Sequence, residues 1–144
     1  MTTVGYVLRE KGHTVWSVAP ELAVFDALKL MAEKEVGAMV VVDQQRMVGI
    51  FSERDYARKV ALMGRSSLTT AVVEIMTEVV STVNPSQGID ECMAIMTNRR
   101  VRHLPVIDGE ELVGIISIGD VVKAIIAEQA DTIRHLEGYI RGSR

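Results

Sequence analysis

The sequence predicts a mixed α/β (α+β) fold made of two similar halves. The pattern Gly-Ile-x-Ser-x-x-Asp occurs twice, at Gly49–Asp55 and at Gly114–Asp120. The chain also matches itself without a gap at an offset of 65 positions, so that residues 15–60 fall on residues 80–125 with about a dozen identical pairs. Two copies are too few for a solenoid, so we expect two halves related by a pseudo-two-fold axis and packed into one module.

Each copy is expected to have the order β-α-β-β-α. The first strand stops at a proline, the next segment has apolar residues at helical spacing, and two apolar, β-rich runs joined by a polar turn follow. The continuous apolar character of these runs indicates strands buried on both faces. The predicted elements of the two copies are strands at 15–18 and 80–83, helices at 24–34 and 89–99, strand pairs within 36–51 and 101–116, and helices that begin at Ser52 and Ser117.

The spacing of these elements divides the chain into four parts. The first repeat with its N-terminal segment is expected at 1–62, a linker at 63–77, and the second repeat at 78–127. An amphipathic helix and a basic tail are expected at 128–144, the helix starting near Ala124.

Composition excludes several classes of protein. The net charge of −3 argues against nucleic acid as a partner, and the single cysteine, Cys92, favours a reducing compartment. Apolar runs such as Ala38–Val42 are far shorter than the roughly 20 residues of a membrane span. Arg9–Lys11 lie where a signal peptide would be apolar, so we expect no export signal and a cytoplasmic location without a membrane partner.

The repeated Ser-x-x-Asp lies where a strand is expected to give way to a helix. The first N–H groups of a helix lack partners within the helix and form a natural phosphate site, to which the Ser52 hydroxyl can add a donor. Asp55 can accept from both hydroxyls of a ribose, while Arg54 and Arg58 can neutralise a phosphate. The alternative is a helix capping box, in which Ser and an acid three residues later satisfy only the backbone.

The duplicated Val-x-Pro, helix, apolar strand and Val-Gly-Ile-x-Ser-x-x-Asp pattern resembles a pair of CBS domains, the Bateman module. The resemblance covers about Val4–Ile126, and the stretch GIFSERDYARKV resembles that of small stand-alone bacterial pairs. It implies adenine-containing ligands, such as AMP, ADP, ATP, NAD(H) or S-adenosylmethionine, in clefts between the two halves.

The strand before each motif is a candidate second wall of such a cleft. Pro105 removes a strand donor, which leaves nearby backbone groups for an adenine edge. The resemblance implies that Arg102, and after it His103, reaches a phosphate; the alternatives are a surface charge and a partly buried histidine. The first copy has Gly37, Ala38 and Met39 here, which leave room for a flat ring but supply no charge.

The lone tryptophan, Trp16, can stack on a base, or it can belong to the core or a dimer contact. The complete set of predicted nucleotide-binding residues is Val15, Trp16, Gly37, Ala38, Met39, Ser52, Arg54, Asp55, Val80, Arg102, His103, Leu104, Pro105, Ser117 and Asp120.

Other chemistry lacks a sequence pattern. The histidines and Cys92 do not have metal-ligand spacing, and neither a nucleophilic triad nor a glycine-rich phosphate loop is recognisable. We therefore expect no enzyme activity, no catalytic cofactor and no metal.

The function predicted is a stand-alone regulatory module. It would sense an adenine nucleotide, change conformation, and signal to an effector protein, and two copies would form a homodimer through apolar helices. The alternatives are a ligand-free structural or dimerisation module, an S-adenosylmethionine sensor and a small nucleotide-converting enzyme. Because Arg54 follows Ser52 closely while Ile118 and Gly119 follow Ser117, we expect two unequal sites. The second would either borrow charge from Arg102 or His103 or accept a less charged part of a ligand.

Overall fold

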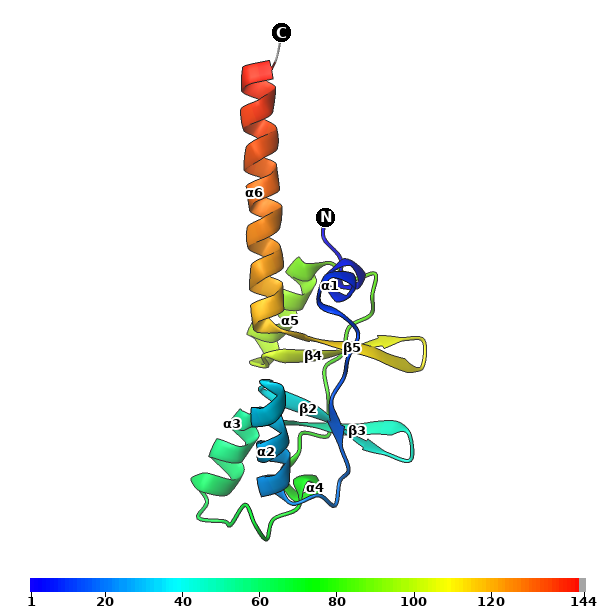
Figure 1. Cartoon of the computed structure of the whole chain (residues 1–144), viewed down its shortest axis with the longest axis vertical. Coiled ribbons are helices and arrows are strands. Elements are labelled where there is room, and N and C mark those ends of the chain that lie inside the picture. Colours follow the sequence, from blue (N-terminus) through cyan, green and yellow to red (C-terminus); the bar gives the residue numbers. More distant parts are fainter. Residues whose placement is uncertain (143–144) are drawn as a thin grey trace. The chain divides into compact units, whose positions relative to one another are not determined.

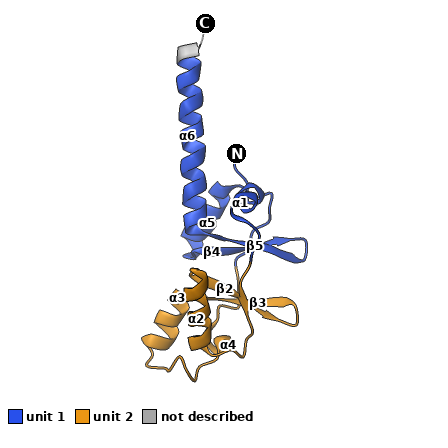
Figure 2. Ribbon diagram, in the orientation of Figure 1, with its two compact units in different colours: residues 1–14, 81–144 blue, residues 15–80 orange. Residues whose placement is uncertain are grey.

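The computed structural model describes residues 1–142, and it forms two compact units (Figures 1 and 2). Residues 15–80 make up one, which we call the first-repeat unit. Residues 1–14 and the chain from Ser81 onward make up the other, the second-repeat unit. The final residues of the predicted basic tail, Ser143 and Arg144, lie outside the described residues. The fold is a mixed α+β one with small sheets, as the sequence predicts.

The first-repeat unit has a three-stranded sheet in the order β1-β2-β3. The pairing of β1 with β2 is parallel and that of β2 with β3 is antiparallel. Phe51 and Met39 are fully buried and belong to its apolar core. The elements are β1 (Ser17–Val18), α2 (Val24–Lys34), β2 (Ala38–Asp43), β3 (Arg46–Ser52), α3 (Glu53–Tyr56), a π-helical segment (Ala57–Ala61) and α4 (Val72–Ile75).

The second-repeat unit repeats this plan with one strand reduced. Its elements are α1 (Val4–Lys11), α5 (Ile89–Arg99), β4 (His103–Asp108), β5 (Glu111–Ser117) and α6 (Ile118–Gly142). The predicted strand at 80–83 is only a parallel bridge between Val83 and Val106. In the first unit Ser17 pairs with Val40, whose counterpart is Pro105. Because proline has no N–H to donate, the pairing cannot continue toward residue 81.

Helices α2 and α5 have the bounds that the sequence predicts, but the strands after them begin two residues late. Each helix is followed by a residue in the left-handed region, Glu35 with φ 55° and Arg100 with φ 56°. The next N–H turns back to the helix: Val36 donates to the Met31 carbonyl and Val101 to the Met96 carbonyl, both at 3.1 Å. These closing bonds hold both valines out of the strands.

The segments that precede the two repeats are exchanged between the units. Helix α1 precedes the first repeat but packs in the second-repeat unit, where Val4 and Leu8 are buried. This differs from the division made on sequence, which grouped residues 1–14 with the first repeat. The apolar spacing of α1 shows that one face must be buried, but it does not say against which sheet.

Part of the predicted linker is a structural element of the first-repeat unit. Thr77, just after α4, exchanges two backbone hydrogen bonds of 2.9 Å with Ile50 in β3. The repeated glycines permit these approaches. A Cβ at Gly49 would lie 2.8 Å from the Thr77 carbonyl oxygen, and one at Gly114 would lie 2.6 Å from Leu8 Cδ2. The glycine of the repeated Gly-Ile motif is thus needed for close packing in each unit.

The chain after β5 is one helix of 25 residues, α6, rather than the two helices expected from the sequence. Its first turns pack on the second-repeat unit through Val121, which is fully buried. Its later turns run past α5 and expose their side chains (Figure 1). No helix within residues 1–142 combines the length and the hydropathy that crossing a membrane requires.

Candidate functional site

The first Ser-x-x-Asp closes a capping box at the start of α3. Ser52 N donates to Asp55 Oδ2 at 2.9 Å, and Asp55 N donates to Ser52 Oγ at 3.2 Å. The Ser52 hydroxyl also donates to Asp55 Oδ2 at 3.1 Å. The capping alternative is therefore present in the structure, and these contacts fix both side chains at the helix N-terminus.

Two further groups contact the other oxygen of Asp55. Lys59 Nζ lies 3.0 Å from Oδ1, and Thr77 Oγ1 donates to the same oxygen at 3.2 Å. A carboxylate has about four acceptor positions. Those of Asp55 are thus occupied, and the side chain is buried, so a ribose would have to displace Lys59 or Thr77.

The second Ser-x-x-Asp has a similar cap and a different cation. Ser117 N donates to Asp120 Oδ2 at 2.8 Å, and Asp120 N donates to Ser117 Oγ at 3.2 Å. Lys11 of α1 donates to the same Asp120 Oδ2 at 2.6 Å and to the Ile115 carbonyl at 2.9 Å. Within the described chain these hydrogen bonds all fall on Oδ2, so Oδ1 of Asp120 remains available as an acceptor.

The electrostatics of the second cluster favour an ionised aspartate beside a neutral histidine. Burial raises the pKa of Asp120, but hydrogen bonds from Lys11 and Ser117 outweigh it and hold the pKa below its ordinary value. Burial and the nearby charges of Lys11 and Arg102 lower the pKa of His103, against the opposite effect of Asp120. The lowered pKa favours the neutral form of the His103 imidazole near pH 7.

The hairpins bring the second predicted wall beside each cap. In the strand register Ala38 lies opposite Ser52, and His103 lies opposite Ser117. The carbonyl of the residue before each strand accepts from the first N–H of the helix: Gly37 from Glu53 at 3.1 Å, and Arg102 from Ile118 at 2.8 Å. Each strand start therefore lies next to the helix N-terminus of its own unit.

The remaining predicted residues differ in exposure. Met39, Leu104 and Pro105 are buried in the sheets, and the Pro105 carbonyl accepts from Val83 N at 3.1 Å. That carbonyl is thus engaged by the chain itself, and a contact between neighbouring backbone groups and an adenine edge stays a prediction. The other predicted residues here are half-buried Val15, Arg54 and Val80.

Trp16 is not a core residue. Its side chain is 39% exposed, and Lys34 Nζ lies 4.3 Å from the centre of its ring, in a cation–π arrangement. The core alternative is wrong, because the Trp16 side chain is exposed and belongs to neither buried apolar cluster. Base stacking by Trp16 stays a prediction.

Three residues of these clusters were not singled out from the sequence. Lys59 has a readable signal, because it follows Asp55 by four residues on the same helical segment. Lys11 and Thr77 have none, since they lie 109 and 22 positions from their aspartates, beyond the reach of any local spacing rule. Lys11 places a positive charge beside Asp120, where the sequence pointed to Arg102 or His103.

Comparison with known proteins agrees with the duplicated architecture. The sequence model of the CBS domain matches residues 12–62 and again residues 72–127. A mitochondrial CBS domain-containing protein of Arabidopsis thaliana, CBSX3, is 41% identical over 98% of this chain and 73% of its own length. A CBS domain-containing protein of Bacillus subtilis, YhcV, is 34% identical over 74% of this chain and 75% of its own.

Solved structures show the same fold. A CBS-domain protein from Burkholderia ambifaria is 56% identical, with a TM-score of 0.86 over 89% of this chain and 96% of that one. A second, from Agrobacterium tumefaciens, is 41% identical, with a TM-score of 0.82 over 85% and 98% of the two chains. The family match, the relatives and the duplicated structure agree: the chain belongs to the CBS-domain family, as a regulatory pair of CBS domains.

Proposed function

We propose that this CBS pair senses an adenosine-containing ligand and passes the signal to a partner protein by a change of conformation. The observation that carries the proposal is the cluster of Ser117, Asp120 and Lys11. It combines the N-terminus of α6, the Asp120 carboxylate with Oδ1 available, and the Lys11 ammonium group, whose Nζ lies 2.6 Å from Asp120 Oδ2. These are the groups that the ribose and phosphate of a nucleotide require.

The two aspartates are proposed to differ in how readily they bind a ribose. Asp120 offers Oδ1 without breaking a contact, whereas Asp55 must first release Lys59 or Thr77. Lys11 can turn from Asp120 toward a phosphate, because its side chain is partly exposed. The cluster of the second-repeat unit is therefore the stronger candidate, and the sites are unequal for a reason the sequence did not reveal.

The candidate ligands are AMP, ADP, ATP, NAD(H) and S-adenosylmethionine. The last is included because a CBS pair from protein MJ0100, 22% identical to this chain, was solved in complex with 5′-methylthioadenosine and S-adenosylmethionine. At this identity the likeness establishes only the shared fold. The ligands of the MJ0100 pair are the reason for including S-adenosylmethionine in the panel of five candidate ligands.

Calorimetric titration with each ligand tests the proposal. We expect one member of the panel to bind, and Asp120→Asn to weaken it about tenfold, about 1.4 kcal/mol. Asp55→Asn should weaken it less. Asp108→Asn, an exposed aspartate at the end of β4 in the same unit, is the matched control and should leave the affinity unchanged.

The second candidate is a ligand-free structural module, which the complete capping box of Asp55 favours. Absence of binding by the whole panel would support it and refute the sensor. Binding that survives both aspartate substitutions would refute the ribose assignment alone. We further propose that two copies form a homodimer and that the output passes to an effector protein.

A further inference from the structure

Helix α6 carries a regular apolar stripe that its own unit does not cover. The stripe residues follow one another at alternating intervals of four and three positions: Val122, Ile126, Gln129, Ile133, Leu136 and Ile140. This is the spacing of the a and d positions of a coiled coil, with isoleucine at all three a positions. Because the spacing is kept to the end of the described helix, it indicates a helix partner along the whole stripe.

The stripe is distinct from the face that packs on the second-repeat unit. That face contains Val121, fully buried, and Ile125, partly buried against the core. The stripe side chains are exposed instead: Ile126 to 60%, Ile133 to 56% and Leu136 to 58%. A contiguous row of large apolar side chains exposed to water is unfavourable, and burying it against a second apolar surface is stabilising.

We propose that the stripe pairs antiparallel with the same stripe of a second copy of this chain. This deepens the homodimer proposed above and rests on it, because it assigns the surface and the register. In the register proposed, Ile126 packs on Leu136 of the second copy and Gln129 packs on Ile133 of the second copy. The contact is isologous, since the same layers repeat on the other side of the two-fold axis.

Charge and size favour the antiparallel orientation. Lys123 and Glu137 both occupy e positions, and flanking e positions meet each other only when the helices run antiparallel. Lys123 then faces Glu137 of the second copy, and the pair occurs twice. Ala130 lies at the centre between them, where a small side chain lets the helices approach. In a parallel pair the same two charges would have no partner across the interface.

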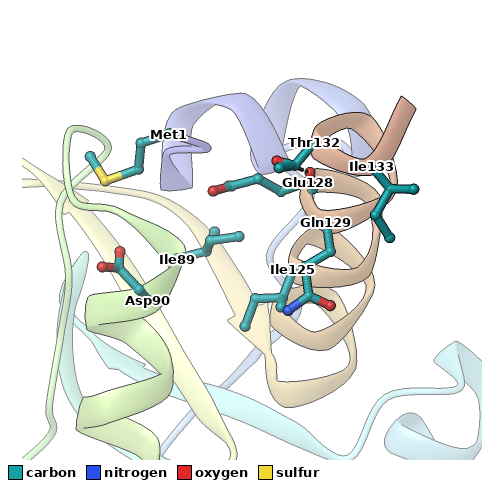
Figure 3. A pocket seen from close by; sticks show the side chains of 8 residues that line it. All are labelled: Met1, Ile89, Asp90, Ile125, Glu128, Gln129, Thr132 and Ile133. Atoms are coloured by element: carbon teal, nitrogen blue, oxygen red, sulfur yellow. Dashed lines mark hydrogen bonds between the residues drawn. The ribbon is translucent and has the colours of Figure 1, made fainter. Parts of the chain in front are cut away.

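A groove beside α6 gives room for the end of the second helix. It has a volume of about 470 Å³ and lies between α6, the start of α5 and Met1 (Figure 3). Ile89, Ile125 and Ile133 provide its apolar lining. In the proposed register Tyr139 of the second copy faces Ile125, so that a side chain 76% exposed in one copy enters this groove.

The groove matters because the stripe is short. From Val122 to Ile140 it spans about 27 Å, or two and a half heptads, fewer than an isolated coiled coil needs. An antiparallel pair sets the unsupported end of each α6 against the supported start of the other. The additional contacts in the groove compensate for the missing heptads.

Mixed disulfide formation tests the orientation and the register. The full chain has one cysteine, Cys92, which is buried, so the unmodified protein is the control and should not cross-link. Copies with Gln129→Cys and copies with Ile133→Cys carry different tags and are mixed under mild oxidation. We expect a disulfide between unlike copies after mixing, and little between like copies.

Several outcomes would overturn the proposal. Disulfides between like copies, without mixed ones, would mean parallel helices. A dimeric mass without cross-linking would refute the surface but keep the homodimer, and a monomeric mass would refute both.

In a second measurement, Leu136→Asp should halve the mass seen by light scattering, while His135→Asp, next to the stripe, should not. Ligand titration of Leu136→Asp keeps the sensor proposal separate.

Discussion

Asp55 and Asp120 occupy matching positions of the repeat, yet their carboxylates have different partners. Asp55 is held by Lys59 of its own helical segment and by Thr77, whereas Asp120 is held by Lys11 of α1. In the first-repeat unit both carboxylate oxygens of this motif's aspartate are therefore engaged by the protein. In the second-repeat unit the contacts found among the described residues engage only Oδ2, so the cluster is partly open. The identity of residues in a repeat does not guarantee identical chemistry, because neighbours from elsewhere in the chain complete each site.

The Asp120 cluster predicts a pH-dependent stability. Folding lowers the pKa of Asp120, so its contribution is complete above the unfolded pKa of about 4 and is lost as pH falls through the folded value. Asp120→Asn should therefore lower the free energy of unfolding by about 1 kcal/mol at pH 7, since the pair is partly exposed. The deficit should shrink toward pH 3.

Urea unfolding of the wild type and the variant between pH 3 and pH 7 measures this difference. Asn keeps an acceptor for Ser117 N, so the variant isolates the charge. A deficit that is the same at every pH would mean that the ion pair with Lys11 contributes nothing in solution.

The two hairpins are equivalent elements with different turn chemistry. Between β2 and β3, Gln44 and Gln45 both have positive φ, 50° and 67°. Between β4 and β5, Gly109 takes the corresponding first turn position with φ 65°. Residues other than glycine are strained at positive φ, so the first hairpin keeps a backbone strain at its two glutamines that Gly109 avoids in the second.

Two substitutions in these turns should have opposite effects. Gln45→Gly is expected to raise the free energy of unfolding by about 0.5 kcal/mol, because relief of strain slightly exceeds the added freedom of the unfolded chain. Gly109→Ala should lower it by about 1 kcal/mol. Shifts in the urea midpoint followed by circular dichroism measure both. Destabilisation by Gln45→Gly would show that the turn strain is negligible.

At the scale of the whole molecule, the chain passes between the units twice, near residue 14 and near residue 80. Each unit is completed by the segment that precedes the other repeat: α1 in the second-repeat unit and α4 in the first. Leu8 is buried beside Gly114, and Ile75 is buried in the core of the other unit. Neither repeat is therefore a complete unit by itself.

Hydrogen exchange can detect this exchanged connectivity. Leu8→Ala removes a buried side chain, at a cost of about 2–5 kcal/mol, and should accelerate amide exchange most in β4 and β5. Ile75→Ala is the matched control and should act most on β2 and β3. Mass spectrometry of the two variants resolves the segments. The reverse pattern, with Leu8→Ala acting mainly on β2 and β3, would contradict the assignment of α1.

The sequence by itself determined the duplication, the family, and the local elements whose signals are short-range. Helices α2 and α5 follow from apolar spacing, and the two caps follow from Ser-x-x-Asp, because their hydrogen bonds join residues within four positions. Only the tertiary structure decided that Lys11 completes the Asp120 cluster, that Pro105 shortens a strand and that α1 belongs to the second-repeat unit. The physical reason is that apolar periodicity specifies which face of a helix is buried, whereas the partner of that face depends on contacts between residues about a hundred positions apart.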